Sequence, residues 1–252
     1  MYIYLYDSFL KDGKHKPQLS AYENRLTDFG IFGKIVRITR FTNPHRIIED
    51  EARRGAKTIV MVGNDDTFAR VISRAADVKG LTFGFLPVGE NNSVSELLGI
   101  PQGVEACDVL ARRRIEKLDV GTFNDRFFFR RISMVGNAFD LVCEDKYAIG
   151  PQGRESEVEI CNLGVPSWID EPTPGMLKPQ DGKFTMFMRP SKKSFFGTKF
   201  IKPSMVQVKK IRAKFARPVV VSVDGVTSKE KHMEVQVSRK KFKIIVGKER
   251  KF

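Results

Sequence analysis

Short apolar runs alternate with helically spaced apolar residues over the first 117 residues of the chain. Thr58–Val62 is a continuous β-branched and apolar run, which is typical of a parallel strand buried on both faces. Apolar residues then recur at helical spacing from Phe68 to Ala75. The segment between them, Gly63–Thr67, is therefore predicted to be a strand-to-helix turn, and function should be sought there first.

The same alternation predicts a parallel α/β domain over residues 1–117. Its other strands are expected at Tyr2–Tyr6, Lys34–Ile38 and Leu81–Leu86, and its other helices at Gln18–Phe29, from Asn43-Pro44 to Gly55, at Ser93–Leu98 and at Gly103–Arg113. Because the carboxyl ends of parallel strands meet at one sheet edge, Gly63–Thr67 and Pro87–Asn92 should open together. Backbone N–H groups and a helix N-terminus at that edge suit a phosphate.

Beyond Leu118 the helical spacing almost disappears, and extended runs rich in Phe and Val take its place. Strands are predicted at Phe127–Ile132, Ser156–Cys161, Phe184–Met188, Val206–Ala213, Val219–Val223, Met233–Val237 and Phe242–Val246. Turn signals separate them at Asn124-Asp125, Pro151–Gly153, Pro172–Gly175, Asp181-Gly182 and Asp224-Gly225, with a short loop between Phe139 and Ser156 and a long loop over Gly164–Lys183. Residues 118–252 are thus predicted to form a mainly antiparallel β-sandwich domain, whose C-terminal end packs back on the first domain.

The net charge of +14 is concentrated near the end of the chain. Residues 183–252 hold 20 Lys and Arg against 4 Asp and Glu, whereas residues 1–182 carry a net charge of −2. A concentrated positive face attracts an anionic membrane surface, nucleic acid or a phosphorylated ligand. A solvated face that keeps the protein soluble is an equally open interpretation.

Several classes of site receive no support from the composition. Cys107, Cys143 and Cys161 are far apart and odd in number, so we expect buried free thiols rather than a metal site or a nucleophile. The three histidines are equally scattered. The first residues lack a basic leader and no apolar run is long enough to span a membrane, so a cytoplasmic protein is expected.

Three short motifs carry the functional interpretation. Gly63–Thr67 reads Gly-Asn-Asp-Asp-Thr, Pro87–Ser93 reads Pro-Val-Gly-Glu-Asn-Asn-Ser, and Val223–Val226 reads Val-Asp-Gly-Val. In order and context they resemble the Gly-Gly-Asp-Gly-Thr, Pro-x-Gly-Thr-x-Asn-Asp and Val-Asp-Gly-Glu motifs of the diacylglycerol kinase catalytic domain family, which includes bacterial lipid kinases and sphingosine kinases. Leu118–Gly121 and Arg212–Pro218 also resemble the family. No motif is intact.

The resemblance implies an ATP-type nucleotide with Mg²⁺ between two domains and transfer of the γ-phosphoryl group to a lipid hydroxyl. Carried over position by position, the nucleotide-binding residues would be Thr39, Gly63, Asn64, Asp65, Asp66, Thr67, Gly89, Glu90 and Asn92. Asn64 and Asp66 replace family glycines, and both residue types tolerate the left-handed conformation. Asp65 and Asp66 are repulsive toward a triphosphate unless a cation such as Mg²⁺ bridges them. Glu90 stands where the family has a nucleotide-contacting Thr.

The family's general base is missing. The Glu that takes the proton from the lipid hydroxyl is Val226 here, and valine cannot accept a proton. Asp224 either substitutes for it or shapes a turn with Gly225. Loss of a general base typically lowers a rate by about 10²–10⁴-fold, although positioning and charge stabilisation dominate phosphoryl transfer.

Three interpretations therefore stand. The first is a lipid kinase-like phosphotransferase, active or degenerate to a pseudokinase that binds nucleotide, held on anionic lipid at the inner membrane surface by its basic domain. The second is a module on a kinase fold without catalysis that binds an anionic partner, either a membrane surface or nucleic acid. In the nucleic-acid form, Phe195, Phe196, Phe200 and Phe215 among lysines would bind a single strand; the competing interpretation is that these phenylalanines are core or strand residues. The third, kinase chemistry on a soluble substrate as in nicotinamide-dinucleotide kinases, lacks their downstream signatures.

Overall fold

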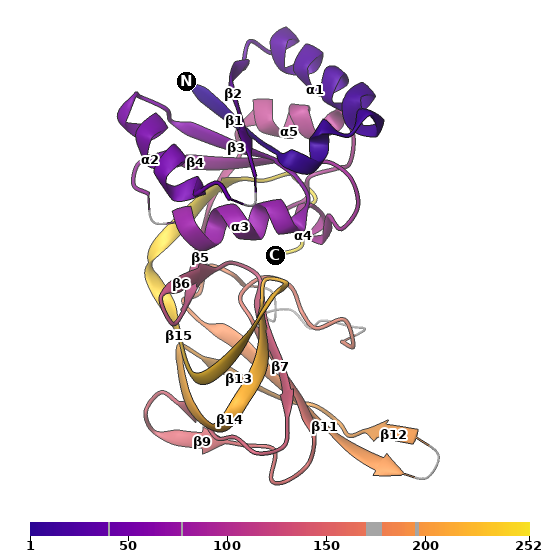
Figure 1. Cartoon of the computed structure of the whole chain (residues 1–252), viewed down its shortest axis with the longest axis vertical. Coiled ribbons are helices and arrows are strands. Elements are labelled where there is room, and N and C mark those ends of the chain that lie inside the picture. The colour runs from indigo at the N-terminus through magenta and orange to yellow at the C-terminus, as the bar shows by residue number, and fades with distance from the viewer. Residues whose placement is uncertain (40, 77, 170–177, 195–196) are drawn as a thin grey trace. The chain divides into compact units, whose positions relative to one another are not determined.

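The computed structural model describes residues 1–39, 41–76, 78–169, 178–194 and 197–252 (Figure 1). The chain divides into two compact units. The first contains Met1–Leu118 together with Lys240–Phe252, and the second contains Asp119–Arg239. The predicted turn Pro172–Gly175 and the candidate side chains of Phe195 and Phe196 lie outside the described residues.

The first unit is a parallel sheet between two layers of helices, as the alternating pattern predicts. Strands β4, β3, β1 and β2 lie in that order, and the end of β15 continues the sheet beyond β4 through the parallel pair Ile244 and Phe83. Helices α1 and α5 pack on one face, and α2 and α3 on the other (Figure 1). The elements are β1 (Tyr2–Asp7), α1 (Lys16–Asp28), β2 (Gly33–Ile38), α2 (Pro44–Arg53), β3 (Thr58–Gly63), α3 (Asp65–Ala75), β4 (Thr82–Pro87), α4 (Ser93–Leu97) and α5 (Glu105–Arg112), with 3-10 turns at Ser8–Lys11 and Gly13–His15.

The local signals in the sequence explain where these elements begin and end. Every residue of β3 and β4 is buried, which accounts for their continuous apolar runs. Asn43 caps α2 by accepting a hydrogen bond from the backbone N–H of His45 at 3.1 Å, and Pro44 occupies the first turn. The returning C-terminal segment fills the same core, since the rings of Phe242 and Phe83 lie 4.6 Å apart. The parallel α/β prediction is thus confirmed.

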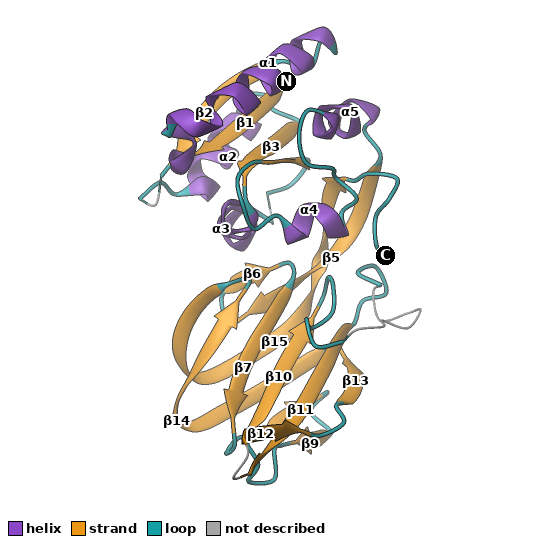
Figure 2. Ribbon diagram, turned by 90° about the vertical axis from the view of Figure 1, so that its right-hand side faces the viewer, coloured by secondary structure: helices purple, strands orange, loops and turns teal. Residues whose placement is uncertain are grey.

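The second unit consists of antiparallel strands. The main sheet order is β12, β11, β10, β7, β14, β15; β13 also pairs with β11, β5 with β15 and β6, and β8 with β14 and β9 (Figure 2). The strands are β5 (Ile115–Phe123), β6 (Arg126–Phe128), β7 (Arg131–Gly136), β8 (Leu141–Cys143), β9 (Tyr147–Ile149), β10 (Ser156–Cys161), β11 (Phe184–Ser194), β12 (Gly197–Phe200), β13 (Ser204–Val208), β14 (Lys210–Val223) and β15 (Val226–Ile245), of which β5 and β15 also have residues in the first unit. The prediction of mainly antiparallel strand pairing in this part of the chain is confirmed.

Several strand boundaries differ from the sequence-based prediction. Phe127–Ile132 is not one strand, because the carboxylate of Asp224 binds the backbone N–H groups of Phe129, Arg130 and Arg131 and bends the chain between β6 and β7. The run Val206–Ala213 is likewise divided, since Glu144 accepts the N–H groups of Lys209 and Lys210 between β13 and β14.

Two further differences have simple causes. Met233–Val237 and Phe242–Val246 were predicted as separate strands, yet β15 is continuous through exposed lysines that interrupt only the apolar pattern. The loop expected between Phe139 and Ser156 contains the β8–β9 hairpin, whose turn residues Glu144 and Asp145 adopt φ values of 54° and 56°.

The exposure of Phe215 and Phe200 tests the interpretations of two of the four candidate phenylalanines. Phe215 is 7% exposed, with its ring 6.4 Å from that of Phe139, so it is a core residue as the packing interpretation predicts. Phe200 is 44% exposed and is the last residue of strand β12, so it is a strand residue rather than a core residue, which the same interpretation allows. No helix in the described part of the chain is long and apolar enough to cross a membrane.

Candidate nucleotide site

The turn after β3 is a tightly closed capping box. Asn64 caps α3 by accepting the backbone N–H of Thr67 at 3.2 Å, and the N–H of Asn64 donates to the Thr67 hydroxyl at 3.3 Å. A Cβ at Gly63, which has a φ of 156°, would lie 2.3 Å from that hydroxyl oxygen. Glycine is therefore required at position 63, and Asn64 preserves the turn in place of the family's second glycine.

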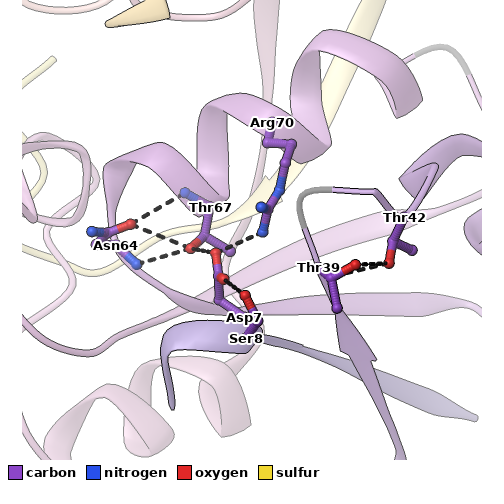
Figure 3. Close-up of polar contacts among 7 residues, drawn as sticks. All are labelled: Asp7, Ser8, Thr39, Thr42, Asn64, Thr67 and Arg70. Atoms are coloured by element: carbon purple, nitrogen blue, oxygen red, sulfur yellow. Dashed lines mark hydrogen bonds and ion pairs between the residues drawn. The ribbon is translucent and has the colours of Figure 1, made fainter. Parts of the chain in front are cut away.

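A buried carboxylate lies directly against this turn (Figure 3). Asp7, the last residue of β1, is 6% exposed, and its Oδ2 accepts the Thr67 hydroxyl at 2.6 Å and Nη2 of Arg70 at 2.6 Å. The hydroxyl of Ser8 donates to the other carboxylate oxygen at 3.3 Å. Asp7 thus joins the end of β1 to the first two turns of α3.

A pocket of about 390 Å³ opens beside this cluster. It is lined by Asp7, Ser8, Phe9, Asn64, Asp66 and Arg70. Its volume lies within the usual range for small-molecule sites. Arg70 lines the pocket, and its Nε is buried and has no hydrogen-bond partner among the described residues. One guanidinium faces two carboxylates there, and a phosphate group would need an accompanying divalent cation.

Asp65 and Asp66 have different surroundings in the structure. Asp66 is exposed and lines the pocket. Asp65 instead accepts the hydroxyl of Ser93 and, at 3.0 Å, the backbone N–H of Val94, so its carboxylate holds the start of α4. Of this pair, therefore, only Asp66 lines the pocket, whereas Asp65 connects the two exit loops.

The Asp65→Ala variant is expected to lose about 1–2 kcal/mol of unfolding free energy, because two donors at the start of α4 would lose their acceptor. Urea unfolding followed by circular dichroism measures the change. Asp66→Ala is the matched control, with an expected change below about 0.5 kcal/mol because Asp66 is exposed. Equal effects of the two substitutions would contradict the linking role of Asp65.

The exit loop of β4 reaches the same edge of the sheet, since Gly63 pairs with Pro87 in the parallel ladder. Asn92 is 7% exposed; its side-chain amide donates to the carbonyl of Gly89 at 2.7 Å, while its Oδ1 has no partner among the described residues. Gly89 adopts a φ of +81°, and a Cβ added there would lie 3.4 Å from the Phe9 ring. Glu90 is exposed to solvent. Asn92 therefore shapes the loop, and its buried Oδ1 remains without a partner among the described residues.

Thr39 also lies at this edge, immediately after Ile38, which pairs with Asp7. Its hydroxyl lies 2.9 Å from that of Thr42, and its backbone N–H donates to the same Thr42 hydroxyl at 2.9 Å. Figure 3 shows this pair beside the Asp7 cluster, bonded within its own turn. The structure thus brings Thr39, Gly63, Asn64, Asp66 and Thr67 to one sheet edge.

Asp224 and Val226 belong to the second unit, at the turn between β14 and β15. Asp224 and Gly225 adopt φ values of 48° and 89°, which is the two-residue hairpin turn expected of an Asp-Gly pair. Burial raises the pKa of Asp224, while hydrogen bonds from three backbone N–H groups at 2.7–2.9 Å oppose that shift. Both carboxylate oxygens are engaged, so this geometry favours the turn-shaping role. Val226 is 55% exposed.

The cysteines and the possible metal ligands give little support for further chemistry. All three cysteines are free and buried, as predicted, and burial raises the pKa of Cys107 to about 12 and that of Cys143 to about 11. Such thiols are poor nucleophiles at neutral pH. The part of the chain that the structure describes contains no group of three or more His, Cys, Asp or Glu residues arranged for a metal ion.

Sequence reasoning missed Asp7, Ser8 and Arg70. The signal for Asp7 and Ser8 was their position at the end of the first strand, which the parallel topology places beside the focal turn. Arg70 lies one helical turn after Asp66 and could have been identified as facing the same way.

The fold is shared with two groups of phosphotransferases. It is similar to a diacylglycerol kinase from Bacillus anthracis str. Sterne, with a TM-score of 0.75 and 17% identity over 98% of this chain and 97% of that chain. An NAD kinase from Archaeoglobus fulgidus in complex with ATP gives a TM-score of 0.60 and 15% identity over 99% and 95%. Yeast NADH kinase complexed with NADH gives 0.55 and 12% over 99% and 84%.

The first part of the chain also matches a family model. The diacylglycerol kinase catalytic domain family matches residues 7–123, from the last residue of β1 to the last residue of β5. The resemblance predicted from the three motifs is thereby confirmed. No curated protein matches the chain.

Proposed function

We propose that this chain is a diacylglycerol kinase-like protein whose α/β unit binds an ATP-type nucleotide with Mg²⁺ and whose phosphoryl transfer is weak or lost. The observation that carries the proposal is the pocket of about 390 Å³ at the carboxyl ends of β1 and β3. The guanidinium of Arg70, which lines the pocket, and the adjoining N-terminal turn of α3 suit a phosphate chain. The match of residues 7–123 to the diacylglycerol kinase catalytic domain supports the same choice of ligand.

Each residue of the pocket has a definite part in this proposal. Arg70 and the side-chain amide of Asn64 donate to phosphate oxygens, and Asp66 holds the divalent cation that offsets the negative charge of the pocket. When bound, Mg²⁺ would neutralise charge on the phosphates. Thr67 and Gly63 keep the turn closed without touching the ligand.

The acceptor in this proposal is a lipid hydroxyl. With Val226 at the position of the family's base and both oxygens of Asp224 occupied, the chain offers no side chain at that turn to take the hydroxyl proton. Turnover is therefore expected to be slow. The protein would be cytoplasmic and peripheral at the inner membrane surface.

A second candidate function is an anion-binding module that retains the kinase fold without catalysis. The segment from Lys183 to Lys209 favours it, because this segment contains seven Lys and Arg and no Asp or Glu. Such a surface attracts anionic lipid or nucleic acid whether or not a nucleotide binds. The two candidates differ in the expected calorimetric response to Mg-ATP, which only the first requires.

The Asp7→Asn variant is expected to bind Mg-ATP about tenfold more tightly than the wild-type protein, which corresponds to about 1.4 kcal/mol. Asparagine keeps an oxygen for the Thr67 hydroxyl but removes the charge that holds Arg70, so the guanidinium becomes available to phosphate. Isothermal titration calorimetry gives the affinity. Asp12→Asn, an exposed carboxylate on the following turn, is the control. Unchanged or weaker binding by Asp7→Asn would contradict the placement of phosphate beside Arg70.

A further inference from the structure

An exposed apolar cluster lies on the outer face of β11 in the second unit. β11 pairs with β12 through Ser191 and Phe200, and with β13 through Phe187 and Met205. Because alternate residues of a strand share a face, Phe200 and Met205 lie on the same face as Arg189. Phe200 is 44% exposed and Met205 50% exposed, although the core face of β11 is well filled.

Arg189 organises this cluster. Its guanidinium carbon lies 3.8 Å from the centre of the Phe200 ring and 4.5 Å from that of Trp168. Its Nη2 and Nε donate to Oε2 of Glu157 at 2.5 and 3.0 Å, so its charge is balanced within the fold. The Trp168 ring also meets Phe187 edge-on at 6.0 Å. The result is an ordered aromatic surface with no net charge at its centre.

Lysines lie on the same β11–β12 ribbon and directly after it. Lys192 and Lys199 pair with each other on the face opposite that of Ser191 and Phe200, and Lys202 follows β12. We define the aromatic-basic patch as Trp168, Phe200, Ile201 and Met205 together with Lys192, Lys199 and Lys202. Ile201 is 36% exposed, and the three lysines are exposed. Since the sequence has no acidic residue between Lys183 and Lys209, nothing in this segment offsets their charge. Figure 1 shows β12 and the end of β11 extending away from the other strands of this unit.

We propose that the aromatic-basic patch docks the protein on an anionic lipid bilayer. Tryptophan and phenylalanine side chains enter the headgroup region, aliphatic side chains such as Ile201 and Met205 enter the acyl boundary, and the lysines on the other face of the narrow β11–β12 ribbon contact anionic headgroups around it. Charge complementarity selects an anionic rather than a neutral bilayer. This inference deepens the membrane-surface part of the proposed function but requires no nucleotide.

A bilayer fits this surface better than single-stranded nucleic acid. Bases stack on the open faces of aromatic rings, and here Arg189 already covers one face of both Phe200 and Trp168. Met205 and Ile201 provide aliphatic surface that stacking does not use. An oligonucleotide is therefore the competing ligand in the test.

Trp168 is the only tryptophan in the chain, so intrinsic fluorescence reports directly on the patch. The full chain without nucleotide is titrated with vesicles of phosphatidylglycerol and phosphatidylcholine. We expect a saturable blue shift, quenching by brominated lipids, and loss of the effect at high salt or with phosphatidylcholine alone. Absence of binding, or binding by cosedimentation without a response of Trp168, would overturn the proposal.

Phe200→Ser/Met205→Ser is expected to weaken vesicle binding by about tenfold, because apolar burial in the bilayer is lost. Phe32→Ser/Ile35→Ser is the matched control, since these residues of the first unit are 69% and 45% exposed. Thermal unfolding monitors the folding of both variants. A second patch variant, Lys199→Gln/Lys202→Gln, leaves the aromatic contacts intact and should also weaken vesicle binding by about tenfold. Equal binding by wild type and both patch variants would overturn the assignment.

The same assay includes a single-stranded oligonucleotide at equal salt. A stronger response of Trp168 to the oligonucleotide than to anionic vesicles would overturn the lipid assignment in favour of nucleic acid. Vesicle binding without Mg-ATP binding would refute the nucleotide proposal alone, whereas Mg-ATP binding without vesicle binding would refute this inference alone.

Discussion

The Val226→Glu variant is expected to phosphorylate diacylglycerol about 10²–10⁴-fold faster than the wild-type protein. The substitution restores a carboxylate at the position of the family's general base. Val226 is 55% exposed and immediately follows a tight Asp-Gly turn, so a glutamate can be accommodated without disturbing the core. The measurement is transfer of radiolabelled γ-phosphate from ATP to diacylglycerol in mixed micelles.

Val220→Glu is the control for this gain. Val220 lies in β14 of the same unit and is 54% exposed, so the substitution adds the same charge to an equally accessible position. It should leave the rate unchanged. Equal rates for Val226→Glu and wild type would contradict a missing proton acceptor as the cause of slow turnover, and would point instead to the altered nucleotide loops.

The second large effect is on stability. Arg70→Leu is expected to lower the free energy of unfolding by about 3 kcal/mol, because it leaves the buried carboxylate of Asp7 without its counter-ion. Asp7→Asn/Arg70→Leu should recover most of this loss, since the neutral amide no longer needs a charge partner. Urea unfolding of the four proteins, including Asp7→Asn, gives the coupling between the two residues.

Arg74→Leu is the matched control for Arg70→Leu. Arg74 lies one turn further along α3 and is exposed, so its replacement should change the unfolding free energy by less than about 0.5 kcal/mol. A double variant as unstable as Arg70→Leu alone would show that the guanidinium stabilises the fold through other contacts. The pair would then have no special link to the pocket.

Most of the first unit was predictable from sequence because its elements carry strong local signals. Thr58–Val62 is apolar throughout, Asn43-Pro44 marks a helix start, and glycine at position 63 fits a turn in which any side chain would meet Thr67. Helical spacing and turn chemistry depend on neighbouring residues, so they can be read without knowledge of tertiary contacts.

The strands of the second unit were harder to predict because distant side chains set their boundaries. Asp224 bends the chain at Arg130, about ninety residues earlier, and Glu144 interrupts the strand at Lys209. Neither contact leaves a pattern near the bend. Similarly, β15 continues through lysines whose exposed side chains resemble a loop in the sequence. Tertiary hydrogen bonds outweigh local propensity in such strands.

The candidate site was predictable only in part. The motifs identified the turn at Gly63–Thr67, but they did not show that Asp65 would be engaged by Ser93 while Asp66 faced the pocket. Asp7 and Arg70 belong to no recognised motif. Their importance follows from a charge pair between the end of one strand and a neighbouring helix, which is a property of the folded chain alone.

Hydrogen–deuterium exchange of the full chain with and without Mg-ATP tests the central claim most directly, since it reports both binding and its location. We expect slower exchange with Mg-ATP in peptides covering residues 7–15 and 63–70, which line the pocket or adjoin it. ATP should slow exchange only when Mg²⁺ is also present, because the two carboxylates repel a bare triphosphate. Unchanged exchange in both peptides at saturating Mg-ATP would contradict a nucleotide site at this edge of the sheet.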